Sequence, residues 1–109
     1  MLLNIILWGA AMSNIINGHL ISIDEADLHK GVFYLPNEVK SIKSYAFASS
    51  NLKKAVLTNN IDEIPEGAFI GCGNLEEIEL PKSIKEIGEN AFYACIKLKK
   101  LIFQQELEP

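Results

Sequence analysis

Two cysteines, Cys72 and Cys95, would be the first candidates for chemistry in this chain if they acted together. Each lies three residues after a phenylalanine, Phe69 or Phe92, so both are expected to occupy the same place in neighbouring structural units. Their Cα atoms could then come near disulfide range, but two sulfur atoms alone do not make a zinc site. Two small buried thiols are the favoured interpretation, and a disulfide or a metal role is the alternative.

A second candidate for metal chemistry is the acidic stretch around His29, SIDEADLHKG at residues 22–31. It has neither the spacing of a calcium loop nor a His-x-x-x-His pair. Ser22 and Glu25 have capping-box spacing, and a glycine closes the stretch. The sequence therefore predicts a short helix at about 23–30, with no metal and no cofactor.

The remaining motifs do not predict catalysis. The glycines of GAFIGCG at residues 67–73 are not a phosphate loop, because no Lys-Ser or Lys-Thr pair follows them. No nucleophile stands in a pattern with a base, and no pair of carboxylates is set in an apolar context. We therefore predict no catalytic residues and a protein that is not an enzyme.

Composition narrows the class of protein further. The chain has 109 residues, 49% of them hydrophobic and 22% charged, which is typical of one ordinary globular domain. Its formal net charge of −4 argues against a nucleic-acid partner, since phosphate binding needs clustered Lys and Arg. No apolar run approaches the roughly 20 residues of a membrane span.

The first twelve residues, MLLNIILWGAAM, contain no charged side chain. They resemble the core of a short signal peptide, with Gly9 and Ala11 as a small-residue pair for cleavage, but no Lys or Arg precedes the apolar run. An apolar segment that covers one end of the core is the favoured interpretation, and Met12 as an alternative start is another. Localisation, cytoplasmic or secreted and cell-surface, therefore stays open.

The elements that would position these residues come from an internal repeat. An Ala-Phe pair recurs at 46–47, 68–69 and 91–92, and further apolar positions align around it. The aligned columns are Val39–Ile61–Ile84, Ile42–Ile64–Ile87, Leu52–Leu75–Leu98, Ala55–Ile78–Leu101 and Leu57–Leu80–Phe103. We divide the chain into a capping segment and partial repeat (1–35), three repeats (36–57, 58–80 and 81–103) and a tail (104–109).

Each repeat predicts two kinds of local structure. Its last residues alternate, so that Ile78 and Leu80 point inward and Glu79 points outward, as in a short strand. The run around Ala-Phe suits a turn that leads into about one turn of helix. A strand that returns at a fixed period near 23 residues stacks in parallel on its copies, as one rung of a solenoid.

Charged residues support this stacking independently. Three columns are basic, acidic and basic in successive repeats: Lys53–Glu76–Lys99, Lys54–Glu77–Lys100 and Lys40–Asp62–Lys85. Parallel neighbours lie about 4.8 Å apart, where opposite charges attract and like charges repel. We interpret the lysine pairs as parts of solvated ion-pair columns, with ligand binding as the alternative.

The pattern V-x-x-I-x-x-x-A-F-x-x-[SC]-x-x-L-x-x-[AIL]-x-[LF] across residues 36–103 resembles the BspA-like, Treponema-type leucine-rich repeat. Residues 31–35 resemble the last strand of a preceding unit. The sequence departs from the general pattern where Ser83 follows Asn60 in the asparagine position and where Ser50 stands in the cysteine position. The resemblance implies an α/β fold: a right-handed leucine-rich-repeat solenoid of short parallel strands with short helical turns. Members are mostly interaction or adhesion modules.

The predicted interior is a ladder of equivalent side chains: Phe47, Phe69 and Phe92, Cys72 and Cys95, and Leu52, Leu75 and Leu98. The candidate partner-binding positions point outward from the strands or flank them: Val56, Glu79, Ile102, Lys54, Glu77 and Lys100.

Extended repeat sheets bind partners on such a face, so the first hypothesis is a module that binds a protein there. The alternative is a structural or capping piece of a larger surface adhesin or secreted effector. In that case the chain would self-associate as a homo-oligomer through an open C-terminal edge.

Overall fold

The computed structural model describes residues 13–58 and 60–104. We call residues 36–57, 58–80 and 81–103 the first, second and third coils. The elements in chain order are β1 (Ser13–Ile16), β2 (His19–Ile23), the 3₁₀ helix η1 (Glu25–Asp27), β3 (Val32–Tyr34), β4 (Ser41–Ile42), β5 (Lys54–Val56), β6 (Glu63–Ile64), β7 (Glu77–Leu80), β8 (Glu86–Ile87) and β9 (Lys100–Phe103).

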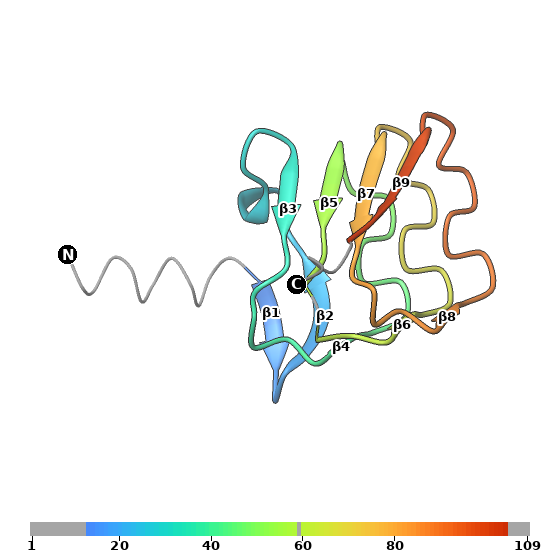
Figure 1. The fold of residues 1–109 in the computed structure, drawn as a ribbon. Coiled ribbons are helices and arrows are strands. Elements are labelled where there is room, and N and C mark those ends of the chain that lie inside the picture. Colours follow the sequence, from blue (N-terminus) through green and yellow to red (C-terminus); the bar gives the residue numbers. More distant parts are fainter. Residues whose placement is uncertain (1–12, 59, 105–109) are drawn as a thin grey trace.

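The coils stack so that equivalent strands pair in parallel, as the repeat predicts. One sheet has the order β3-β5-β7-β9, and these four strands lie side by side along one side of the stack (Figure 1). Ala55 pairs with Ile78 and Ile78 with Leu101, so a sequence column is a strand register. A second side is built by the short parallel pair β6-β8 and by β2-β4. The stacked parallel strands of a solenoid are thus confirmed.

The turns around Ala-Phe are not the helical turns expected from the sequence. Tyr45 and Ser49 have φ of +64° and +56°, which is left-handed backbone that an α-helix excludes. Between them, Ala48 N donates to Tyr45 O at 3.1 Å, which closes a tight turn. The N–H groups of alternate residues donate to the next coil instead: Tyr45, Phe47 and Ser49 to the carbonyl oxygens of Glu66, Ala68 and Ile70.

The second coil repeats this pattern, with Gly67, Phe69 and Gly71 donating to Glu89, Ala91 and Tyr93. Bonds between coils therefore replace the i→i−4 bonds of a helix. In the described part of the chain, the three-residue η1 is the one helical element.

The N-terminal segment also differs from its prediction. Asn17 and Gly18, with φ of +52° and +83°, form a tight turn between the antiparallel strands β1 and β2. The helix predicted at about 23–30 is wrong in length, because Ile23 belongs to β2 and His29 exchanges backbone hydrogen bonds with Val32. Only η1 remains, and Asp27 there accepts the Asp24 N–H at 2.6 Å.

The interior is a stack of the predicted ladder residues. The Phe47 and Phe69 rings stack at 4.4 Å between centroids, and those of Phe69 and Phe92 at 5.7 Å. At the other end Phe33 meets Phe47 edge-on at 5.1 Å and closes the column. Phe47, Phe69, Cys72, Leu52 and Leu75 are fully buried. Phe92, Cys95 and Leu98 of the third coil are only partly buried.

Two predicted segments fall outside the described residues: the signal-like residues 1–12 and most of the tail, 105–109. Within the residues that the structure does describe, no helix is long and apolar enough to cross a membrane.

Candidate functional site

The outward face of the β3-β5-β7-β9 sheet presents two rows of aligned side chains. Because successive residues of a strand point to opposite sides, the residues on either side of each inward-pointing strand centre face outward together. One row is Tyr34–Val56–Glu79–Ile102, and the other is Val32–Lys54–Glu77–Lys100. We call these eight residues the strand face. All six candidate binding residues of the sequence lie in it.

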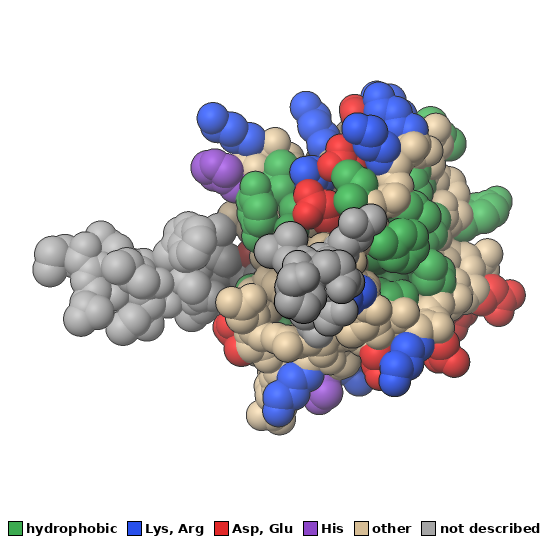
Figure 2. Space-filling model, viewed as in Figure 1, with side chains coloured by type: hydrophobic (Ala, Val, Ile, Leu, Met, Phe, Trp, Pro, Cys, Tyr) green, Lys and Arg blue, Asp and Glu red, His purple; other side chains and the backbone are tan. Residues whose placement is uncertain are grey.

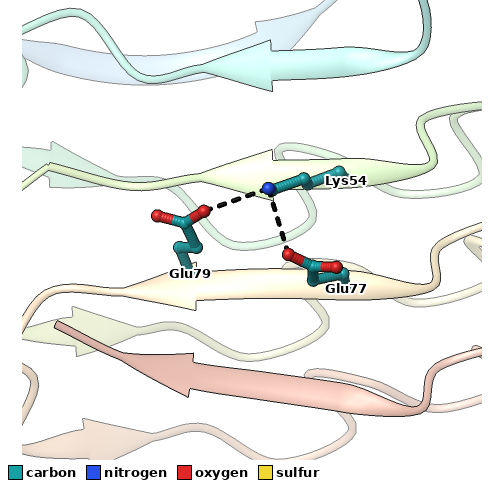
Figure 3. A network of polar contacts seen from close by, with 3 residues as sticks. All are labelled: Lys54, Glu77 and Glu79. Atoms are coloured by element: carbon teal, nitrogen blue, oxygen red, sulfur yellow. Dashed lines mark ion pairs between the residues drawn. The ribbon is translucent and has the colours of Figure 1, made fainter.

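The centre of the strand face is a three-residue ion cluster. The Lys54 ammonium lies 3.0 Å from Glu77 Oε2 and 3.0 Å from Glu79 Oε2, so it reaches from β5 to two places on β7 (Figure 3). Hydrogen bonds to Glu79 and then to Glu77 raise the pKa of Lys54 above 10.5. The aligned charge columns of the sequence predicted the ion pair of Lys54 with Glu77, but not the diagonal ion pair of Lys54 with Glu79. Two carboxylates on one ammonium leave this centre acidic.

Apolar side chains flank the cluster on both sides. Tyr34 is 59% exposed on β3, and Ile102 is 39% exposed on β9. Val56, next to Tyr34 in register, is half-buried. The strand face therefore offers an aromatic ring, an acidic centre and an aliphatic edge over four strands.

Sequence reasoning missed Tyr34 as a site residue. The signal was present, because residues 31–35 were already interpreted as the strand of a preceding unit. Continuing the alternation by one unit places Tyr34 in the column of Val56, as the register shows.

The neighbouring charge column behaves in part as predicted. Lys99 Nζ lies 3.7 Å from Glu76 Oε1, and the two side chains are 69% and 45% exposed. Lys100 lies opposite Glu77 in the register of β7 and β9. Exposed pairs of this kind contribute little to stability, about 0.2–1 kcal/mol each.

The cysteine column is structural. Cys72 and Cys95 are both free, and each thiol donates to a phenylalanine carbonyl one coil earlier, Phe47 O and Phe69 O, at 3.0 Å. Burial raises the pKa of both thiols. Among residues 13–58 and 60–104, no group of three or more His, Cys, Asp or Glu is placed to hold a metal ion.

Side chains in the asparagine position of the repeat also form hydrogen bonds between coils. Asn60 Nδ2 donates to Asn37 O, and Ser83 Oγ donates to Ile61 O at 2.5 Å. A serine thus makes a bond between coils where the general repeat pattern has asparagine.

The comparisons with known proteins bear on this arrangement. Residues 28–109 match the model of a family described as "BspA type Leucine rich repeat region (6 copies)". No match was found among curated proteins.

Among solved structures, the chain is similar to the crystal structure of a leucine rich cell surface protein from Faecalibacterium prausnitzii A2-165. The two are 22% identical, over 70% of this chain and 32% of that one, with a TM-score of 0.37. This chain therefore spans about a third of that protein.

Proposed function

Because the chain belongs to the BspA-type leucine-rich repeat family, we propose that it is a non-enzymatic module that binds a protein partner on its strand face. The observation that carries the proposal is the exposed Tyr34, in register with Val56 across two strands. An exposed aromatic beside a partly buried aliphatic residue is a typical anchor of a protein interface.

The acidic centre sets the chemistry of the partner. Lys54, Glu77 and Glu79 together carry one positive and two negative charges within a single cluster. A partner with a Lys or Arg opposite this centre and an apolar side chain against Tyr34 would match both features. Complementary charges of this kind favour specificity and association rate.

The test compares two double variants of equal hydrophobic loss. In the first, Tyr34→Ser is combined with Ile102→Ser on the strand face. In the control, Tyr93→Ser is combined with Ile96→Ser, which removes two side chains that are 66% and 83% exposed outside that sheet. We expect the first variant to lose partner recovery about tenfold, since 1.4 kcal/mol is a factor of ten, and the control to match wild type. Equal recovery by both variants would contradict the proposal.

The alternative role, a structural or capping piece of a larger surface protein, is supported by the exposed apolar side chains of the third coil. In that role the chain needs no partner on its strand face. Recovery would then be unaffected by the Tyr34 and Ile102 substitutions.

A further inference from the structure

The third coil leaves exposed the apolar residues that the second coil buries. Ile87, Leu101 and Phe103 are 47%, 44% and 53% exposed, whereas their equivalents Ile64, Ile78 and Leu80 are all at 0%. Ile84, Phe92, Cys95 and Leu98 are only partly buried. Figure 2 shows hydrophobic side chains gathered over this end of the stack, with Lys side chains near the beginning of β9. We call this surface the end coil face.

Backbone N–H groups on the end coil face also indicate that a further coil can bind there. In the first two coils, three alternating N–H groups of each Ala-Phe turn donate to the next coil. Their equivalents in the third coil are Asn90, Phe92 and Ala94, and no acceptor for these N–H groups lies among the described residues. β9 is also the last strand of its sheet. A polypeptide in the repeat geometry would accept hydrogen bonds from these N–H groups with its turn and would pair with β9 through its strand.

Charge specifies which coil fits. Lys54 of the first coil holds Glu77 and Glu79 of the second at 3.0 Å. In the third coil, Lys100 is the equivalent of Lys54, and its side chain is exposed. A coil placed on β9 in the same register would set its own equivalents of Glu77 and Glu79 against Lys100.

We propose that the end coil face binds an acidic coil of the same repeat type, carried by another polypeptide, with a Glu-Glu-apolar-Glu-apolar strand paired in parallel to β9. The two surfaces share Lys100, which lies at the border between the strand face and the end coil face. The proposal does not depend on what binds to the rest of the strand face.

A second copy of this chain fits less well. The free strands of its four-stranded sheet would be β3, with Val32–Tyr34, and β9, with Lys100–Phe103. Neither strand contains an acidic residue to set against Lys99 and Lys100.

The probe is a labelled synthetic peptide of residues 58–80 with Cys72→Ser, a change that follows Ser50 in the first coil. A second peptide carries Glu76→Lys, Glu77→Lys and Glu79→Lys in addition. Fluorescence anisotropy with the full chain measures the binding of each. We expect the acidic peptide to bind saturably and about 2–10-fold more tightly than the basic one, and added salt to narrow that difference.

The matched variants exchange the charges on the protein. Lys99→Glu with Lys100→Glu should invert the preference between the two peptides. Lys43→Glu changes the sign of an exposed lysine in the first coil and should leave the preference unchanged. Circular dichroism confirms that each variant is folded.

Three results would overturn the proposal: no binding of the acidic peptide at millimolar concentration, equal binding of both peptides, or a preference that survives the double charge reversal. Light scattering adds a fourth, namely a stable dimer that the acidic peptide does not dissociate. That result would assign the end coil face to a second copy.

Discussion

The residue that precedes each Ala-Phe pair has a left-handed backbone, with φ of +64° at Tyr45, +59° at Gly67 and +58° at Asn90. Only glycine adopts this conformation without a steric cost of about 1–2 kcal/mol. At Gly67 the space is also occupied, because an added Cβ would lie 2.2 Å from Cε1 of Tyr45. The tyrosine ring of one coil therefore lies against the glycine of the next.

We predict that Gly67→Ala lowers the free energy of unfolding by about 2 kcal/mol or more, from left-handed strain and displacement of the Tyr45 ring. Chemical denaturation followed by circular dichroism measures the change. Gly73→Ala is the control, because nothing lies within 4 Å of a Cβ there and its φ is not left-handed. Equal losses of unfolding free energy at the two sites would show that the close contact of Tyr45 with Gly67 does not affect stability.

The two thiols, one buried and one partly buried, make the stability of the fold sensitive to alkaline pH. Burial raises the pKa of Cys72 and Cys95 above the ordinary value of 9.0. A group whose pKa is higher in the folded state favours folding below its unfolded pKa, and this contribution is lost as the pH rises through the folded value. We expect the urea concentration at the midpoint of unfolding to decrease as the pH is raised from 8 to 10.

A variant with Cys72→Ala and Cys95→Ala should lose part of that fall, leaving the contributions of Tyr45 and Lys54, whose pKa values are also raised by hydrogen bonds to glutamates. An unchanged pH dependence in the thiol-free variant would refute the assignment to the cysteines.

At the scale of the elements, one column of equivalent residues has a different environment in each coil. Phe69 is fully buried between the rings of Phe47 and Phe92. Phe92 has a ring on one side only in the described stack and is partly buried. The cost of removing a ring should therefore follow its place in the stack.

We predict that Phe69→Ala costs about 3–5 kcal/mol of stability, as expected for a large side chain lost from a packed core. Phe92→Ala should cost clearly less. Thermal and urea unfolding of the two variants measure the difference. Similar losses would imply that the third coil is covered in solution.

The sequence predicted the strands better than the turns. Strand columns such as Ala55–Ile78–Leu101 follow directly from period and alternation, and the register matches them. The Ala-Phe turns look helical in a single repeat, because small apolar residues permit a helix. Their backbone N–H groups form hydrogen bonds to the neighbouring coil instead. The helix propensity of a single repeat does not take such a neighbour into account.

At the scale of the whole molecule, the two ends of the stack differ among the residues that the structure describes. Next to the first coil, Phe33 packs edge-on against Phe47, and β2 of the β1-β2 hairpin pairs with β4. At the other end the third coil exposes apolar side chains. The position of Lys54 between two glutamates needed three-dimensional information, since the diagonal contact with Glu79 depends on side-chain reach.

Each of the three coils contributes one strand to the four-stranded sheet, and we propose that a protein partner docks on its outward face. Photo-cross-linking tests it most directly, with a benzophenone amino acid replacing Tyr34 on the strand face or Tyr93, which is 66% exposed in the third Ala-Phe turn. We predict that the probe at position 34 cross-links to one defined protein and that the probe at position 93 does not. A cross-link to that protein from position 93 alone, or equally from both, would contradict binding through the strand face.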